Sequence, residues 1–133
     1  MARFPSSEWA SRFESAINQN SAYADAAKAW EGEILLLVLP DTESPGGSGI
    51  LLDLHHGVCR SARFVADANG VATEFVYQGG RSQWARLLRH EIDPVKAWLD
   101  GTFQVKGNLA KAMRFTRAAK ELVETAASIP TEF

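Results

Sequence analysis

The sequence has only one cysteine and no long hydrophobic run. The lone Cys59 cannot form a disulfide within the chain, which is typical of proteins in a reducing compartment. The longest apolar run, Ile34 to Leu39, is far shorter than the roughly 20 residues that cross a bilayer. The first residues lack the apolar stretch of a secretory signal, and the last residues lack a peroxisomal address. These absences together predict a cytoplasmic protein.

The chain also has little net charge and no internal repeat. Its 14 lysine and arginine residues stand against 16 aspartate and glutamate residues, a formal net charge of −2 at pH 7. Nucleic-acid-binding domains normally carry an excess of clustered basic residues, so we expect no nucleic-acid partner. A length of 133 residues with 46% hydrophobic residues is enough for one core. The composition therefore predicts a single domain over residues 1–133.

Familiar catalytic and metal-binding motifs are missing as well. The sequence contains no Cys-x-x-Cys and no His-Glu-x-x-His, the spacings typical of zinc sites. The segment Gly46 to Gly49 lacks the Gly-Lys-Ser/Thr ending of a phosphate-binding loop. No pair of carboxylates stands out as general acid and base. We therefore expect no catalytic residue, no metal site and no cofactor, and the protein is predicted not to be an enzyme.

One group of residues could still suggest metal binding or acid–base chemistry: Asp53, His55, His56, Cys59 and His90. We interpret His55 and His56 as turn residues. Neighbouring residues on a strand point to opposite faces, so these two imidazoles are not expected to share a metal ion. We interpret Cys59 as a small buried apolar residue, because a lone cysteine on a strand usually has that role.

Apolar spacing predicts two helices at the start of the chain, followed by strands. Ser6 or Ser7 can cap the first helix and Ser21 the second, which Gly32 is expected to end. Four segments have the composition of strands: residues 34–39, 50–54, 60–66 and 71–78. Turn residues separate them, among them His55-His56-Gly57. We expect these strands to form an antiparallel meander.

The segment from Asp93 to Ala127 predicts a short helix, a strand and a long helix, after an earlier helix capped by Ser82. Asp93 can cap the short helix, with Pro94 at its first position. Residues 102–106 alternate as in a half-buried strand, and Asn108 can cap the long final helix. The predicted order is two helices, four strands, two helices, one strand and one helix. This order indicates the α+β class, with a five-stranded mostly antiparallel sheet covered by helices.

Several of these segments resemble the sterol carrier protein 2 (SCP-2) family. The matching residues, in family order, are Trp30-Glu31-Gly32-Glu33-Ile34, Leu52-Asp53-Leu54 before Gly57, Thr73 to Tyr77 before Gly79, Trp84, Leu88, Asp93-Pro94, Ala97, Gly101, Val105-Lys106-Gly107-Asn108 and Ala112-Met113. The resemblance covers roughly residues 22–123 and is to the prokaryotic, stand-alone type of member. It implies an SCP-2-like fold in which an apolar tunnel lies between the sheet and the helices.

The resemblance further implies non-enzymatic binding and transfer of a lipid, such as a fatty acid, fatty acyl-CoA, phospholipid or sterol-like molecule. It carries no catalytic residue. The candidate lining residues are Phe64, Val76, Trp84, Leu88, Trp98, Phe103, Val105, Leu109 and Met113. Lys106 and Arg114 are candidates for contact with an anionic head group. The absent peroxisomal address and the His-His-Gly turn depart from the family pattern and argue against a peroxisomal role and a sterol ligand.

Two alternatives remain open at this point. The first is an SCP-2-fold interaction or dimerisation module whose interior is filled and binds no ligand. The second is an enzyme that uses Cys59 or the histidines. Transient contact with a membrane and formation of a homodimer are further partner hypotheses that the sequence neither requires nor excludes.

Overall fold

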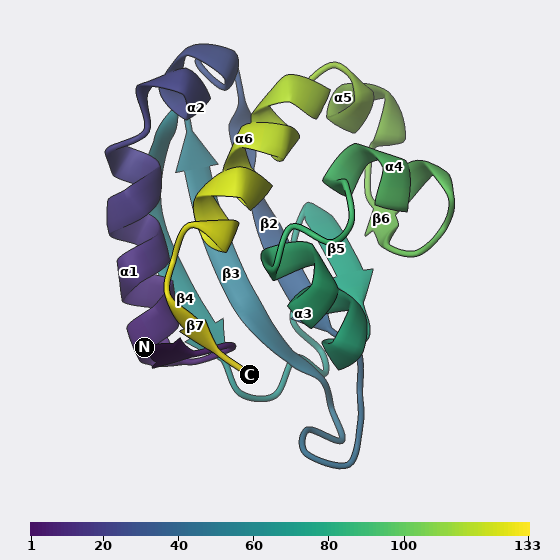
Figure 1. The fold of residues 1–133 in the computed structure, drawn as a ribbon. Helices are drawn as coiled ribbons and strands as arrows, with labels where there is room; N and C mark the ends of the chain where they lie inside the picture. Colours follow the sequence, from purple (N-terminus) through teal and green to yellow (C-terminus); the bar gives the residue numbers. More distant parts are fainter.

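A five-stranded sheet lies at the centre of the computed structural model, which describes residues 1–133. The elements in chain order are β1 (Ala2–Arg3), α1 (Ser7–Asn18), α2 (Ser21–Ala26), β2 (Glu31–Val38), β3 (Ser48–His55), β4 (Val58–Val65), β5 (Phe75–Gly79), α3 (Arg81–Leu88), α4 (Pro94–Leu99), β6 (Gln104–Lys106), α5 (Leu109–Met113), α6 (Thr116–Ala127) and β7 (Thr131–Glu132). Figure 1 shows α3, α4 and α6 in front of the sheet and α1 beside β4. The predicted α+β class is confirmed.

The strand order of the large sheet is β4-β3-β2-β5-β6. The prediction of a meander was wrong for β5, which pairs with β2 in a parallel arrangement instead of following β4. The apolar run of β2 explains this result, because a strand that is apolar on both faces belongs in the middle of a sheet. β4, with Arg60, Ser61 and Arg63, is polar enough to form an edge. All other pairings in this sheet are antiparallel.

Several predicted boundaries move in the structure. Gly32 lies inside β2 instead of ending α2, which stops at Ala26. The strand predicted over residues 102–106 begins at Gln104, and β5 begins at Phe75. The single long final helix is two helices, because the chain turns at Arg114 and Phe115 between α5 and α6. Two-residue strands β1 and β7 also form a small parallel sheet that residue alternation could not predict.

The buried faces of the helices follow the sequence pattern, and three of the five predicted caps are confirmed. The caps predicted at Ser21 and Ser82 are wrong, because Asn20 caps α2 and Gly80 precedes α3 without a side-chain cap. The side chains of Ser6, Asp93 and Asn108 accept hydrogen bonds from backbone N–H groups in the first turns of α1, α4 and α5. In α1, Trp9 and Phe13 are completely buried. None of the helices has the length and apolarity that a bilayer crossing would require.

The predicted turn between β3 and β4 is confirmed. His56 and Gly57 both have positive φ angles, 50° and 82°, as in the two-residue turns that match the twist of a hairpin. At Gly57 a Cβ atom would lie 2.6 Å from the carbonyl oxygen of Ala24 in α2. Only glycine therefore allows this turn to pack so closely against α2.

Asn18, at the end of α1, forms two hydrogen bonds with the beginning of β4. Its Nδ2 donates to the carbonyl oxygen of Cys59 at 2.9 Å, and its Oδ1 accepts from the N–H of Cys59 at 2.8 Å. The side-chain amide thus pairs with both backbone polar groups of one residue, as a neighbouring strand would. The pair ties the first helix to the hairpin that carries the His56-Gly57 turn.

We predict that Asn18→Ala destabilises the protein by roughly 1–3 kcal/mol, because the substitution leaves two partly buried backbone groups without these partners. The free energy of unfolding in urea measures this change. Gln19→Ala is the matched control: Gln19 is the exposed next residue, and its replacement should change stability by less than about 0.5 kcal/mol. Equal effects of the two substitutions would contradict the assigned role of Asn18.

Candidate functional site

A cavity of about 100 Å³ lies between the sheet and the helices, and 17 of its 19 lining residues are hydrophobic. The strands supply Ile34, Leu36, Leu54, Phe75, Val76, Tyr77 and Val105. The helices and their connections supply Tyr23, Trp30, Pro94, Val95, Trp98, Ala112, Phe115, Thr116, Ala118, Ala119, Leu122 and Val123. Both walls are therefore apolar, and they come from segments far apart in the sequence.

Polar groups are scarce in this lining. Thr116 and the tyrosines Tyr23 and Tyr77 carry its only side-chain hydroxyls, and the Tyr77 hydroxyl donates to the carbonyl oxygen of Pro94 at 3.1 Å. Burial raises the pKa of both tyrosines above the ordinary value, so both remain neutral at physiological pH. The cavity consequently suits a hydrocarbon and offers no charged group to a polar substrate.

The size difference between facing side chains leaves this space open. On the helical wall, α6 presents Thr116, Ala118 and Ala119 at its N-terminal end. Opposite them the sheet presents branched and aromatic side chains. Ala118 is buried while Ala119 is exposed, so the rim of the cavity runs along this helix.

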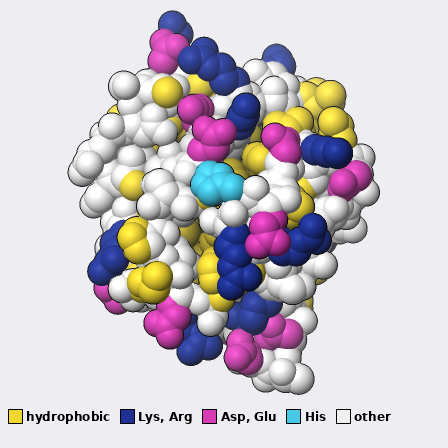
Figure 2. Space-filling model, in the orientation of Figure 1, with side chains coloured by type: hydrophobic (Ala, Val, Ile, Leu, Met, Phe, Trp, Pro, Cys, Tyr) yellow, Lys and Arg dark blue, Asp and Glu magenta, His cyan; other side chains and the backbone are white.

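The helix α5 covers the neighbouring part of the rim, with Ala112 partly buried in the lining and no residue fully buried. Leu109 and Met113 on this helix, and Leu99 at the end of α4, are all exposed hydrophobic residues. Figure 2 shows hydrophobic and basic side chains near one another on the upper right of the molecule, where Figure 1 places α4 and α5. This part of the surface therefore differs from an ordinary polar surface.

The structure places three of the nine predicted lining residues on the cavity wall: Val76, Trp98 and Val105. The other six lie elsewhere. Trp84, Leu88 and Phe103 are buried in the packed core, and Phe64 is partly buried against it. Leu109 and Met113 are exposed because the break before α6 turns α5 outwards. A role of any of the nine in ligand binding stays a prediction.

Trp84 and Phe103 lie off the wall because they pack against each other and against Tyr77. The Phe103 ring stacks on Tyr77 at 4.9 Å and meets Trp84 edge-on at 5.0 Å. Beneath Phe103 there is no room for a side chain at Gly79, where a Cβ would lie 2.6 Å from the ring. Apolar spacing could not separate this filled region from the cavity, because both contain the same residue types.

Sequence reasoning missed the lining residues Tyr23, Trp30 and Phe115. Tyr23 lies in α2 and Trp30 directly before β2. Apolar spacing alone does not distinguish a core residue from a cavity wall. Phe115 was expected within a continuous helix. It instead precedes α6, and its ring meets Trp30 edge-on at 5.0 Å between centroids.

A positive charge lies beside one end of the cavity. The Lys111 ammonium is 2.9 Å from the Glu74 carboxylate, donates to the carbonyl oxygen of Glu31, and lies 4.7 Å from the centre of the Trp30 ring. Lys111 is therefore held in place by a salt bridge and a cation–π contact. The predicted head-group residues Lys106 and Arg114 are exposed.

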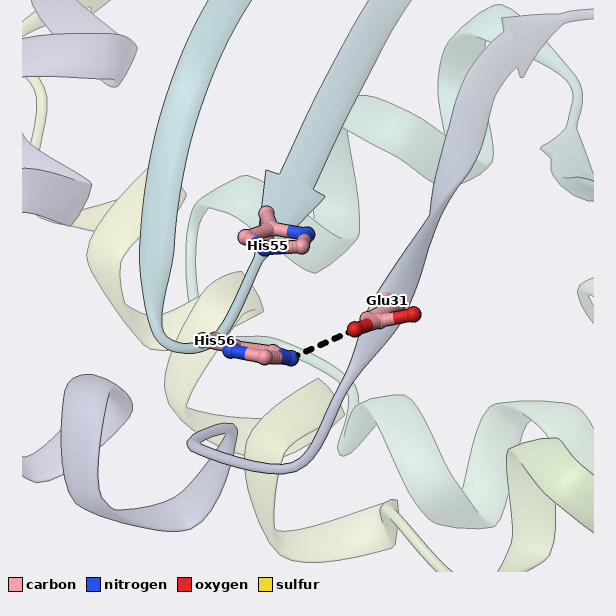
Figure 3. Close-up of side chains that lie close together, drawn as sticks. All are labelled: Glu31, His55 and His56. Carbon is pink, nitrogen blue, oxygen red and sulfur yellow. Dashed lines mark hydrogen bonds and ion pairs between the residues drawn. The ribbon is translucent and has the colours of Figure 1, made fainter.

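The two adjacent histidines do share one region of space, contrary to the sequence interpretation. Figure 3 shows the rings of His55 and His56 lying one above the other, with Glu31 beside them. The rings stack with centroids 4.1 Å apart, because His56 occupies the turn and no longer follows the alternation of the strand. Asp53 instead pairs with Arg60 at 3.0 Å.

Cys59 is buried, as expected, and its thiol donates to the carbonyl oxygen of Ser61. Burial, aided by repulsion from the Glu14 carboxylate, raises the pKa of the Cys59 thiol to about 12. The thiolate is the reactive form of cysteine. At neutral pH the side chain therefore remains a protonated, unreactive thiol, which argues against its use as a nucleophile.

Comparison with known proteins agrees with this geometry. The sequence profile of the SCP-2 sterol transfer family matches residues 13–120. A crystal structure of sterol carrier protein 2 is 32% identical with a TM-score of 0.88, covering 93% of this chain and 97% of that one. No curated protein sequence matches the chain.

Two further solved structures are similar. The solution structure of a conserved hypothetical protein from Thermus thermophilus is 30% identical with a TM-score of 0.87, covering 99% of this chain and 93% of that one. Sterol carrier protein 2 from Yarrowia lipolytica, in its apo form, is 15% identical with a TM-score of 0.56, covering 90% and 89%. At this low identity, the similarity to the Yarrowia lipolytica protein shows only a shared fold.

We predict that Cys59 in the native protein reacts with a disulfide reagent at pH 8 at least about 100-fold more slowly than in the denatured chain, because its thiolate is scarce and buried. The rate of thiol release measures this difference. Val58→Cys in a Cys59→Ala background is the control, since Val58 is exposed and a thiol there should react rapidly. If Cys59 reacted rapidly in the native protein, the result would contradict this prediction and support a role of Cys59 as a nucleophile.

Proposed function

Because the chain belongs to the SCP-2 sterol transfer family, we propose that its cavity binds the hydrocarbon chain of a lipid, which the protein carries to or from a membrane. Family membership supports a lipid-binding or lipid-transfer domain in general. The observation that carries the finer proposal is the lining, which is hydrophobic at 17 of 19 positions. In this proposal the whole chain acts as one cytoplasmic lipid-binding domain and performs no chemical step.

The size of the cavity favours an acyl chain as the ligand. An apolar cavity of about 150 Å³ holds one benzene molecule, so about 100 Å³ accommodates on the order of four carbon atoms of an acyl chain. A flexible acyl chain can insert in part and leave its head group at the rim. A rigid sterol ring system has to enter as a whole, which would require the helices to move apart.

Burial of the chain supplies the free energy of binding. Each methylene that leaves water contributes about 0.8 kcal/mol, so four contribute on the order of 3 kcal/mol before the cost of ordering the chain. The wall needs no polar group for this purpose. We propose that α5 moves to admit the chain, because a helix with no fully buried side chain has little apolar contact to lose. This movement breaks the salt bridge between Lys111 and Glu74, which holds α5 against the sheet.

We further propose that the segment over residues 94–120 faces the membrane during transfer. Six of the 14 lysines and arginines, but only one of the 16 acidic residues, lie in this segment. The same segment exposes Leu99 by 74% and Met113 by 59%. Apolar side chains that enter the interface, flanked by basic ones that meet anionic lipid head groups, are the usual means of peripheral membrane binding. The segment also includes the cavity rim.

We predict that Ala118→Phe weakens binding of a fluorescent fatty acid at least about tenfold, because the ring displaces space for two or more methylenes, worth about 1.6 kcal/mol. Fluorescence titration measures the dissociation constant, and the thermal unfolding curve verifies that the variant folds. Met113→Phe is the matched control and should leave binding within about twofold, since Met113 lies outside the lining.

Unchanged binding by a folded Ala118→Phe protein would contradict the proposed cavity. Mass spectrometry of organic extracts of the purified protein separates the remaining possibilities. A co-purified acyl lipid supports the proposal, whereas a protein that neither co-purifies with lipid nor binds the probe would be the interaction module without a ligand.

We predict that the protein co-sediments with phosphatidylserine-containing vesicles at low salt, and much less with neutral vesicles or at high salt, because basic residues and exposed apolar residues act together. Leu99→Ser should reduce the bound fraction severalfold. Leu39→Ser is the control, because Leu39 is also an exposed leucine but follows β2, outside the segment. Equal loss in both variants, or binding without a preference for anionic lipid, would refute the proposed orientation.

A further inference from the structure

Three potential metal ligands meet at the end of the sheet where β2 begins and β3 turns into β4. They are the carboxylate of Glu31 and the imidazoles of His55 and His56, and one ligand atom from each lies within 4.8 Å of the others. Figure 3 shows both rings directed towards the side of Glu31, with a line from His56 to the carboxylate. The cluster lies outside the lining of the lipid cavity.

The fold itself brings these side chains together. Glu31 and His55 are directly opposite each other in the antiparallel pairing of β2 with β3, so their side chains lie on the same face of the sheet. His56 would point away if the strand continued. Its φ angle of 50° instead returns its ring to His55, where the two rings stack at 4.1 Å.

The backbone around the cluster is already fixed. The N–H of His56 donates to the carbonyl oxygen of Trp30 at 2.8 Å, which ties the turn to the residue before Glu31. Gly57 packs closely against Ala24 of α2. The ligands therefore project from anchored backbone, and binding an ion requires only side-chain rotations, which lowers its cost in conformational entropy.

From this arrangement we infer that Glu31, His55 and His56 form a binding site for a divalent transition-metal ion, of which Zn²⁺ is the natural probe. Two imidazole nitrogens and one carboxylate oxygen are a ligand set that zinc accepts, with water in the fourth position. Ca²⁺ and Mg²⁺ prefer oxygen ligands alone and fit this set poorly.

The distances are close to those that an ion needs. Ligands at about 2.0–2.1 Å from zinc lie about 3.3 Å from one another in a tetrahedron. His56 Nε2 and Glu31 Oε1 are now 2.6 Å apart and joined by a hydrogen bond, so an ion would replace this bond and separate the two atoms slightly. The two ligand atoms that lie farthest apart have to come closer through a small side-chain rotation. The exposure of Glu31 and His56 permits this rotation.

The positive charge that contacts the backbone of Glu31 is offset by a carboxylate. Lys111 contacts the carbonyl oxygen of Glu31, but its ammonium already pairs with the carboxylate of Glu74. The carboxylate of Glu31 therefore forms its hydrogen bond with His56. The site is independent of the lipid cavity, and its test does not require a lipid.

The experiment is calorimetric titration of the metal-free protein with zinc chloride, and the decisive variant is His56→Asn. Asn-Gly is the preferred sequence for a two-residue hairpin turn, so this variant removes the imidazole while preserving the fold. His90→Asn is a closely matched control, because His90 also has a positive φ angle, 61°, but lies outside the cluster.

The site predicts one zinc ion per chain, with affinity reduced at least about tenfold in His56→Asn, His55→Gln and Glu31→Gln, as removal of a ligand requires. His90→Asn should bind as tightly as the unaltered protein. The chain has three histidines, so NMR can follow each imidazole, and zinc should shift the signals of His55 and His56 but not His90.

Two results would overturn the inference. One is a titration in which the unaltered protein does not bind zinc, or binds it no more tightly than His56→Asn does. The other is a set of NMR shifts that includes His90 or excludes either His55 or His56. In either case the cluster is an ordinary surface hydrogen bond between Glu31 and His56.

Discussion

Contacts between aromatic rings at the two ends of the interior set the distance between helices and sheet. At one end Trp30 packs against Phe75 and Phe115, with ring centroids 5.1 and 5.0 Å apart. At the other, Phe103 contacts Tyr77 and Trp84. Such rings pack at separations that are costly to compress, so the contact of Phe115 with Trp30 holds the start of α6 away from the sheet. Its small side chains leave the space unfilled, and the cavity is a consequence of this spacing.

The same arrangement explains why the stable and the adaptable parts of the molecule are separate. α1 with its buried Trp9 and the hairpin of β3 and β4 form a densely packed half. In this half the side chains of Asn18 and Glu14 both hydrogen-bond to the backbone of β4. The opposite half consists of the short elements α4, β6 and α5, and no residue of α5 is fully buried. Local opening is easiest where few apolar contacts are lost. The half that is easiest to open is also the one that borders the cavity.

Sequence reasoning predicted well what depends on neighbouring residues. The caps at Ser6, Asp93 and Asn108, the turn at His56 and Gly57, and the α+β class all depend on local chemistry, and the family could be identified from motif order. It failed where contacts between segments distant in the sequence determine the structure. The partner of β5, the break before α6 and the side of the core on which Phe103 lies depend on packing between elements that no local pattern records. The meeting of Glu31 with both histidines required the strand register as well as the turn conformation.

The parallel pairing of β2 with β5 has a consequence for how the polypeptide reaches its native state. Ile34 lies opposite Phe75, so a long intervening stretch must be synthesised and ordered before that contact can form, and such distant pairings are slow to establish. Until then one side of β2, the most apolar strand, is an open edge that can pair with other chains. The flank of the sheet that borders the cavity is therefore slow to close, and the newly made chain is most vulnerable to aggregation there.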